Sequence, residues 1–340
     1  MANKVTINDI AANLGLSRNT VSRVLNGSEG ISNETRLKVL EEATRVNYKM
    51  LGTRVAAEEK KPEAKVILVT KDIQLVSGTI FNFMMFSLQP MIKARHASLD
   101  IRFMSDAEVN SGKLPPQTGE ADAIIIFEIL NEEYIQLLMN TGKPCIMFDC
   151  PVDPNIFRGK FDVVMEDGTA ISQLVREETD RGVRKFGFVG DPTHCLGYRG
   201  RYNAFRNTID EYPDAEHLAY DVIDPEYPGM NFKKVFTQKL RKMELPEVFV
   251  CANHFLAQTM VSAAKKLSIA TPEKLRIYSF GLRTYFGYGN DKKSEDHRHV
   301  EDLASTMVML VFDRLRYPDV GRRVVRLQAQ VHLVTKQSDV

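Results

Sequence analysis

Hydrophobic positions recur with a helical period over the first 48 residues of the chain. The pattern predicts a first helix over 7–13 and a second helix that begins after Ser17 and ends at Asn26. A third helix is predicted to begin at Ser32 or Asn33. The apolar residues on the shared inner faces are Ile7, Ile10, Ala11, Leu14, Val21, Val24, Leu25, Leu37, Leu40, Ala43 and Val46. Three short helices around one small core are therefore expected at 1–48.

The pattern changes after residue 48. Residues 49–63 are small, polar and charged, which is typical of a linker. Beyond them, apolar runs of strand length alternate with amphipathic stretches of helical length. The predicted strands are 66–70, 123–127, 145–148, 186–189, 248–251 and 277–280, and the predicted helices are 81–97, 131–141, 168–181, 199–211, 254–267 and 300–315. This alternation indicates βαβ units with parallel sheets, and a chain of 340 residues suits two such sheets rather than one.

Composition and charge add little to this picture. The chain is 44% hydrophobic and 26% charged, as soluble globular proteins are, and its formal net charge is +1. Residues 1–54 carry eight Lys and Arg against five Asp and Glu, so a slightly basic head precedes a mildly acidic remainder. That distribution fits a DNA-binding module but does not by itself identify one.

Several classes of protein are disfavoured. The four cysteines show no C-x-x-C pairing and lie in or beside apolar runs, which favours reduced thiols in a cytosolic protein. The N-terminus has no signal-peptide core, and no stretch approaches the roughly 18 apolar residues of a membrane span. His297 and His299 lie in a charged loop whose spacing does not indicate a metal site. Without a G-x-S-x-G motif, P-loop or glycine fingerprint, we expect a cytoplasmic protein that is not an enzyme and has no cofactor.

The most informative stretch is the second predicted helix, which reads LSRNTVSRVLNG over 16–27. Its inward positions are Val21, Val24 and Leu25, and its outward positions are Arg18, Asn19, Ser22 and Arg23. A helix that reads the major groove needs such a surface, because Arg pairs with guanine, Asn pairs with adenine, and hydroxyls hold phosphate. An ordinary amphipathic surface helix has the same periodicity, so the pattern alone leaves both interpretations open.

Residues 4–48 resemble the DNA-binding headpiece of the lactose/galactose repressor family. The matching segments are VTI-x-DIA at 5–11, GLS at 15–17, TVSRVLNG at 20–27, IS at 31–32, TR at 35–36 and NY at 47–48. The resemblance implies a helix-turn-helix domain at 1–48 and a homodimer that binds a pseudo-palindromic double-stranded DNA operator. It places Arg18 and Asn19 at the two variable base-reading positions. The implied DNA-contacting residues are Thr6, Ser17, Arg18, Asn19, Thr20, Ser22, Arg23, Asn26 and Tyr48.

The hinge or linker at 49–63 departs from the family pattern. The family usually has a Pro two residues after Asn-Tyr, and a hinge helix whose Leu wedges into the minor groove and kinks DNA. Here Met50 takes the place of the Pro, and Val55 or Ala57 is the residue nearest the lever position. We assign the hinge contacts to Arg54, Val55 and Ala57 and expect weaker kinking of DNA.

Residues 64–338 resemble the core of the same family, which is similar to a periplasmic sugar-binding protein. The resemblance implies an α/β core of two Rossmann-like lobes at 64–340, with an effector in the cleft between them. We expect the N-lobe at about 64–155 and 285–317, and the C-lobe at about 156–284 and 318–340. Ligands in such folds lie at the carboxyl ends of strands. The implied effector-binding residues are Phe81, Asp149, Arg201 and Asn253.

Each polar effector candidate also has a purely structural interpretation. Asp149 would cap a turn, Arg201 would pair with a carboxylate, and Asn253 would cap the helix that follows it. The usual Phe-Asp-Asp of the family is Phe280-Gly281-Leu282 here, so one acidic contact is missing. We therefore leave open a modified or phosphorylated sugar, a non-sugar ligand, or no ligand.

Two functions remain in competition. The first is a repressor of carbohydrate-metabolism genes that is controlled by a small-molecule effector, a sugar or sugar derivative. The alternative is a DNA-binding regulator whose core has lost sugar binding and responds to a protein partner or a non-sugar ligand. A sugar-binding transport protein is disfavoured by the helix-turn-helix pattern. The C-terminus carries no leucine heptads, so a dimer is expected rather than a tethered tetramer.

Overall fold

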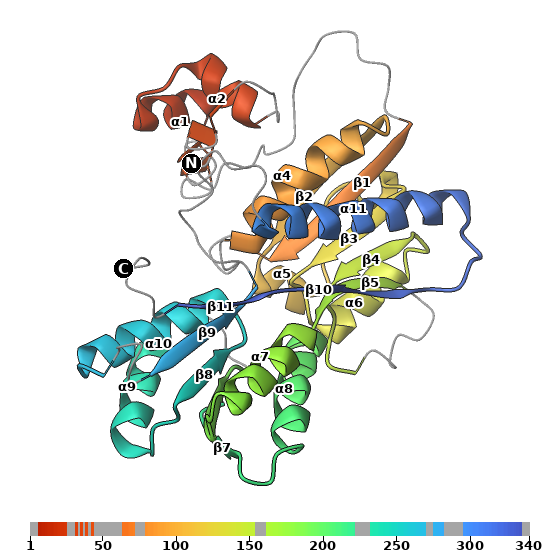
Figure 1. The fold of residues 1–340 in the computed structure, drawn as a ribbon. Helices are drawn as coiled ribbons and strands as arrows, with labels where there is room; N and C mark the ends of the chain where they lie inside the picture. Colours follow the sequence, from red (N-terminus) through yellow and green to blue (C-terminus); the bar gives the residue numbers. More distant parts are fainter. Residues whose placement is uncertain are drawn as a thin grey trace. The chain divides into compact units, whose positions relative to one another are not determined.

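The computed structural model describes two compact units (Figure 1). Unit 1 comprises Met1–Phe148, Gly159–Asp162 and Tyr285–Arg323, and unit 2 comprises Asp149–Arg158, Val163–Thr284 and Val324–Val340. The residues described within them are 6–25, 31–32, 35–36, 38–39, 42–43, 63–71, 79–153, 161–221, 232–269, 275–281 and 295–334, with the backbone alone at 79, 81–83 and 295–297. The chain passes between the units after Phe148, Arg158, Asp162, Thr284 and Arg323. The boundary predicted after 284 coincides with one of these, whereas those predicted after 155 and 317 lie within seven residues of Phe148 and Arg323.

The N-terminal part of unit 1 has its own small core. Helices α1 (Ile7–Leu14) and α2 (Arg18–Leu25) pack against each other. Gly15 ends α1 with a left-handed φ of 63°, a conformation that glycine adopts without steric cost. The buried residues of this core are Ile10, Ala11, Val21, Val24, Leu25, Val39 and Ala43. The first two predicted helices are confirmed within one residue at each described end.

The rest of unit 1 is a layered α/β structure. Strands β1 (Ala64–Lys71), β2 (Ala97–Met104), β3 (Ala123–Phe127) and β4 (Cys145–Phe148) are parallel and lie in the order β4-β3-β1-β2. Helices α4 (Thr79–Lys93) and α11 (Glu295–Arg316) lie side by side on this sheet (Figure 1). The shorter elements are α5 (Asp106–Asn110), η1 (Thr118–Glu120) and α6 (Glu132–Met139). Every residue of β3 and β4 is buried, which explains their continuous apolar runs.

Unit 2 repeats this architecture around a five-stranded sheet of order β11-β9-β8-β6-β7. Strands β6 (Lys185–Val189), β7 (Glu216–Leu218), β8 (Val248–Cys251) and β9 (Arg276–Phe280) are parallel, and β11 (Val331–Leu333) runs antiparallel to β9. The helices are α7 (Thr169–Asp180), α8 (Leu196–Ile209), α9 (Phe232–Lys242) and α10 (His254–Lys266). Helix α7 packs on α8, and α9 packs on α10. In addition β5 (Asp162–Asp167) pairs in parallel with β10 (Val324–Gln328).

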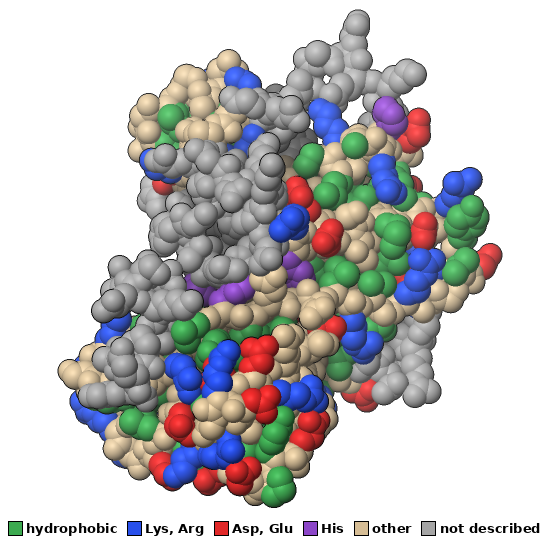
Figure 2. Space-filling model, viewed as in Figure 1, with side chains coloured by type: hydrophobic (Ala, Val, Ile, Leu, Met, Phe, Trp, Pro, Cys, Tyr) green, Lys and Arg blue, Asp and Glu red, His purple; other side chains and the backbone are tan. Residues whose placement is uncertain are grey.

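Ion pairs tie the surface of unit 2 together. Arg176 pairs with Glu211 at 2.9 Å, and Arg184 and Lys185 pair with Asp214 and Glu244. Basic and acidic side chains are accordingly interspersed over the lower part of the face shown in Figure 2. Pairs exposed in this way contribute only ~0–1 kcal/mol each to stability.

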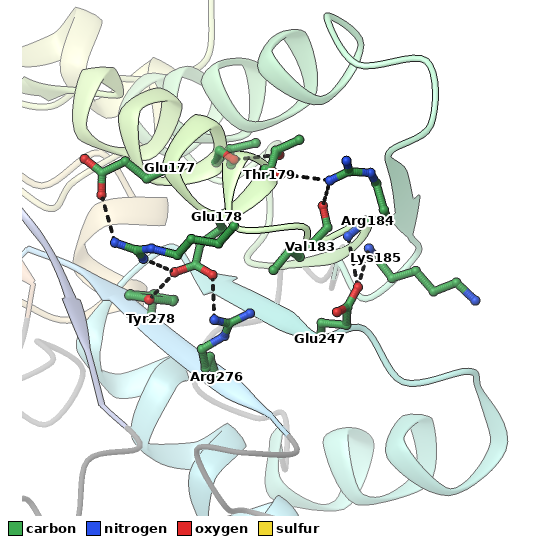
Figure 3. A network of polar contacts seen from close by, with 11 residues as sticks. Glu177, Glu178, Thr179, Val183, Arg184, Lys185, Glu247, Arg276 and Tyr278 are labelled. Atoms are coloured by element: carbon green, nitrogen blue, oxygen red, sulfur yellow. Dashed lines mark hydrogen bonds and ion pairs between the residues drawn. The ribbon is translucent and has the colours of Figure 1, made fainter.

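One carboxylate of unit 2 is buried within a denser network (Figure 3). Glu178 of α7 has no exposed surface, and it accepts a hydrogen bond from the Tyr278 hydroxyl at 2.7 Å. Arg181 Nη1 and Arg276 Nη1 lie 2.6 and 2.9 Å from its two oxygens. Burial, and then the bond to Glu178, raise the pKa of Tyr278 to about 12. The network fixes the C-terminal end of α7 to β9.

All four cysteines are buried and free, as predicted. Burial raises the pKa of Cys145 and of Cys150 to about 12, and it also raises the pKa values of Cys195 and Cys251. Within the described residues, no helix combines the length and apolar character that crossing a membrane requires.

Candidate functional site

The N-terminus of α1 is fixed by a reciprocal capping box. The amide N–H of Thr6 donates to Asp9 Oδ2 at 2.7 Å, and the amide N–H of Asp9 donates to the Thr6 hydroxyl at 3.4 Å. The Thr6 hydroxyl also donates to Asp9 Oδ2, and these bonds lower the pKa of Asp9. The capping box pairs amide groups of the first turn of α1 with side-chain oxygens, which stabilises the start of the helix.

Helix α2 is capped in a related way. Ser17 Oγ accepts the amide N–H of Thr20 at 3.0 Å and lies 2.8 Å from the Thr20 hydroxyl. Ser32 repeats the arrangement before the third predicted helix, because its hydroxyl accepts the amide N–H of Thr35 at 3.2 Å. Serine is favoured at positions 17 and 32 because its side chain caps the start of the helix that follows, whatever other contacts it makes.

The two faces of α2 differ sharply. Val21, Val24 and Leu25 are 0%, 2% and 5% exposed and fill the small core. The opposite face carries Ser17, Arg18, Asn19 and Arg23, which are exposed, and Thr20 and Ser22, which are half-buried. The apolar residues therefore fix how α2 sits, while a guanidinium, an amide and hydroxyls are presented near the helix N-terminus. Such a set can donate to base edges and to phosphate oxygens.

Some predicted site residues lie outside the described residues. These are Asn26 and Tyr48 of the headpiece and Arg54, Val55 and Ala57 of the hinge. Phe81 lies in the first turns of α4, and its side chain is also outside the description. Their assigned roles stay predictions.

The three remaining effector candidates, Asp149, Arg201 and Asn253, are all in unit 2. Asp149 directly follows β4 and adopts a left-handed φ of 59°. Its Oδ1 accepts the amide N–H groups of Cys150 at 2.7 Å and of Gly197 at 2.9 Å. Its Oδ2 accepts the thiol of Cys195 at 3.1 Å. Asp149 thus caps the N-terminus of α8, a structural role like the one considered for it, although a helix rather than a turn is capped.

Arg201, in the second turn of α8, is only 7% exposed. Its Nη2 donates to Glu166 Oε2 at 2.8 Å, and its Nη1 donates to the carbonyl oxygen of Ala252 at 2.8 Å. Its guanidinium lies 4.1 Å from the ring centroid of Phe280, a cation–π arrangement. Its Nε–H has no hydrogen-bond acceptor among the described residues. Arg201 therefore has the carboxylate partner that its structural interpretation requires.

Asn253 begins α10 at the carboxyl end of β8. Its Oδ1 accepts the amide N–H of Leu256 at 2.9 Å, and its Nδ2 donates to the hydroxyl of Tyr198. The guanidinium of Arg201 lies 5.0 Å from the centroid of the Tyr198 ring. Tyr198 therefore joins the two candidates, a role that nothing in the sequence pattern indicated.

The fold thus gathers Asp149, Arg201 and Asn253 around the first two turns of α8. Each candidate has a structural partner, and an effector contact by the same side chain stays a prediction. Sequence reasoning missed Tyr198 and Glu166, although the Glu-Asp-Gly at the end of β5 was a usable signal for the latter.

The missing acid of the Phe-Asp-Asp segment has a local explanation. Gly281 follows β9 with a φ of 79°, and its N–H donates to the carbonyl oxygen of Gln330 at 2.9 Å. A side chain at this φ would strain the backbone, so glycine suits the turn that leads out of β9. Among the residues that the structure describes, no group of three or more His, Cys, Asp or Glu side chains is placed to hold a metal ion.

Two family models match the chain. The model described as "Bacterial regulatory proteins, lacI family" matches residues 6–50, and the "Periplasmic binding protein-like domain" model matches residues 175–338. The first covers α1 and α2, and the second covers most of unit 2.

Curated relatives match along nearly the whole chain. The HTH-type transcriptional regulator GanR of Bacillus subtilis is 24% identical over 98% of this chain and 99% of its own length. The HTH-type transcriptional regulator GalR of Lacticaseibacillus casei is 23% identical over 96% and 97% of the two chains. The sucrose operon repressor of Pediococcus pentosaceus is 22% identical over 92% and 93%.

Solved structures share the fold. A complex of the transcriptional regulator CelR with cellobiose has a TM-score of 0.65 at 16% identity, covering 96% of this chain and 98% of CelR. The lac repressor dimer bound to operator and the anti-inducer ONPF has a TM-score of 0.59 at 15% identity, covering 98% and 99%. The predicted fold class, a helix-turn-helix headpiece followed by a two-lobed α/β core, is confirmed.

Proposed function

We propose that this chain, which belongs to the lacI family of bacterial regulatory proteins, represses transcription by binding a specific operator through α1 and α2. The observation that carries the proposal is the contrast between the buried apolar face and the exposed polar face of α2. Its buried Val21, Val24 and Leu25 fix the helix, and Arg18 and Asn19 stand exposed at its first turn.

The chemistry of this face suits direct reading of base pairs. Arg18 presents the fork of donors that matches guanine, and Asn19 presents the donor and acceptor that match adenine. A well-placed pair of this kind discriminates against the wrong base by ~1–3 kcal/mol. Ser17, Thr20 and the N-terminal amide groups of α2 suit phosphate oxygens, which set the register of the helix on the duplex.

A homodimer would present two copies of α2 to the two half-sites of a pseudo-palindrome. In such complexes the half-site centres are about 34–36 Å apart, one turn of DNA. The basic excess of the head adds a sequence-independent attraction that weakens with salt. Specificity then depends on the base-reading residues, and affinity depends in large part on phosphate contacts.

We further propose that a small-molecule effector bound by unit 2 controls operator binding. Asp149, Arg201 and Asn253 lie together around the start of α8, at the carboxyl ends of strands. An effector acts through its different affinity for the operator-binding and released states of the protein. A sugar or sugar derivative is the ligand class favoured by the relatives, one of which is a sucrose operon repressor.

The alternative, a regulator that responds to a non-sugar ligand or a protein partner, is favoured by two observations. Asp149, Arg201 and Asn253 each already bond within unit 2, with only the Nε–H of Arg201 lacking an acceptor among the described residues. Gly281 also replaces an expected acid. These two versions share the DNA-binding function and differ only in the ligand.

Selection of duplexes from a randomised pool by the full-length protein tests the proposal. We expect enrichment of a pseudo-palindrome, and loss of that enrichment in the double variant Arg18→Ala/Asn19→Ala. The selection should be run at low salt, with and without a panel of sugars, sugar phosphates and purines. A folded protein that enriches no sequence under any of these conditions would refute operator recognition.

A further inference from the structure

Gly197 lies in the first turn of α8, beside the proposed effector site of unit 2 on which this inference rests. Gly197 leaves space that the Asp149 carboxylate occupies. A Cβ built on Gly197 would lie 2.2 Å from Asp149 Oδ2 and 3.1 Å from its Cγ. Any other residue at 197 is therefore incompatible with the observed position of this carboxylate.

The position of the carboxylate has a clear physical cause. Cys195 is the N-cap residue of α8, and its side chain makes no capping hydrogen bond. Asp149 performs the capping instead, from 48 residues earlier in the chain, by accepting the Gly197 N–H and the Cys195 thiol. A carboxylate at a helix N-terminus is stabilised by the exposed amide groups and by the helix dipole. Asp149 is thus held at the start of α8 by two hydrogen bonds, and a third bond, from the N–H of the adjacent Cys150, fixes the carboxylate locally.

Most of the neighbouring polar groups are similarly engaged, although the Arg201 Nε–H has no acceptor among the described residues. Arg201 donates to Glu166 and to the Ala252 carbonyl, and Asn253 bonds to the Leu256 amide and the Tyr198 hydroxyl. Sugar hydroxyls are bound most strongly by charged groups that have hydrogen-bonding capacity to offer. Except at the Arg201 Nε–H, a hydroxyl group would here have to compete with existing bonds, and Gly281 brings no replacement carboxylate.

We propose that Gly197 is a specificity-determining residue: by admitting the Asp149 carboxylate to the N-terminus of α8, it withdraws that carboxylate from hydroxyl binding. The effector favoured by this arrangement is a modified or phosphorylated sugar or a non-sugar ligand rather than a plain polyol. Asp149 acts as a positioning residue for α8, and its release would restore an acceptor for a polyol.

Helix α8 supplies a matched control. A Cβ on Gly200, three residues along the same helix, meets nothing within 4 Å. Gly200→Ala should therefore raise Tm, because alanine favours helix over glycine. Gly197→Ala should lower Tm, because the carboxylate must leave its place.

The decisive measurement is stabilisation of the full chain by D-galactose, D-ribose and sucrose in thermal-shift assays and calorimetry. The wild type and Gly200→Ala should show no response at millimolar sugar. Gly197→Ala should gain affinity of about tenfold or more for at least one sugar, since one charge-assisted hydrogen bond is recovered. The double variant Gly197→Ala/Asp149→Asn should lose that gain.

Two outcomes overturn the proposal. One is a wild type that binds a sugar and loses the binding with Asp149→Asn, because the carboxylate would then already be available. The other is a folded Gly197→Ala protein with no sugar response. Operator binding, measured without sugar by fluorescence anisotropy, checks that each variant is folded. It also separates this test from the proposed function, which fails only when the wild type binds no operator.

If Gly197→Ala does not fold, Asp149→Asn carries the test through amide hydrogen exchange. The proposal expects faster exchange confined to the first turn of α8, and unchanged exchange there overturns it.

Discussion

Asp162 and Arg314 form an ion pair with no exposed side-chain surface in unit 1. Arg314 Nη2 donates to Asp162 Oδ1 at 2.6 Å, and Arg314 Nε donates to Asp162 Oδ2. Asp162 Oδ1 also accepts the amide N–H of Arg323 at 2.7 Å, and Arg314 donates to the carbonyl oxygens of Val320 and Gly321. The chain leaves unit 1 after Asp162 and again after Arg323. The Asp162 carboxylate therefore joins both of these segments to α11.

Removing this carboxylate should be costly. Asp162→Ala leaves Arg314 buried and without its charged partner, and we expect a loss of about 3–5 kcal/mol in the free energy of unfolding. Urea unfolding followed by circular dichroism measures this loss. Asp313→Ala is the control, because its pair with Arg323 is about one-third exposed and contributes ~0–1 kcal/mol. Equal effects of the two substitutions would contradict the assignment.

The Glu178 network gives a second, smaller prediction. Glu178→Ala should lower the free energy of unfolding by about 1–3 kcal/mol, because the buried Tyr278 hydroxyl loses its acceptor. The cost is smaller than at Asp162, since Arg181 and Arg276 reach solvent. The adjacent Glu177→Ala is the control, because Glu177 is exposed and lies 4.0 Å from Arg181. Chemical denaturation of both variants decides the matter, and a Glu177 effect as large as that of Glu178 would refute it.

The DNA-binding proposal predicts an asymmetric effect of Arg18→Ala. A guanidinium that reads a base should contribute about 1–3 kcal/mol to discrimination, roughly 5- to 150-fold in relative affinity. Competition anisotropy with the selected operator and a scrambled duplex measures both affinities. An arginine that touches only phosphate would instead weaken both complexes equally and reduce the salt slope by about one.

Acid stability provides a test of the capping box at α5. Hydrogen bonds from Lys113, and then from Ser105, lower the pKa of Glu108 from 4.5 to about 2. Because the folded pKa lies below the unfolded value, this stabilisation is present above pH 4.5 and is lost as the pH falls towards 2. The free energy of unfolding of Glu108→Gln should therefore be lower than that of the wild type near neutral pH. The two values should converge in acid. Lys113→Ala should reproduce part of this difference. A difference between Glu108→Gln and the wild type that persists unchanged at pH 2 would contradict the role assigned to the Glu108 carboxylate.

Local patterns predicted the headpiece and the buried strands well. The two faces of α2 follow from the spacing of Val21, Val24 and Leu25, and β3 was predicted with its observed bounds, because a fully buried strand is a continuous apolar run. β2 was missed: the predicted helix extended to residue 97, where the strand begins, although ASLDIRFM alternates with period two. β7 and β11 have only three residues each, too short for a periodic signal.

The partners of charged groups could not be predicted from local pattern. Glu178 meets Tyr278 from 100 positions away, and Asp162 meets Arg314 from 152 positions away. The sequence indicated that Asp149 had either a capping or a ligand-binding role, but it did not indicate α8 as the helix to be capped. That choice depends on the close approach of Gly197, which only the fold reveals.

The burial of every cysteine has a practical consequence. Maleimide reagents attack the thiolate, and with pKa values near 12 at Cys145 and Cys150 almost none is present at neutral pH. A single cysteine introduced at Leu114, whose side chain is 40% exposed, would therefore accept a fluorophore over a nearly silent background. Single-molecule observation of this protein on DNA requires no prior removal of its native thiols.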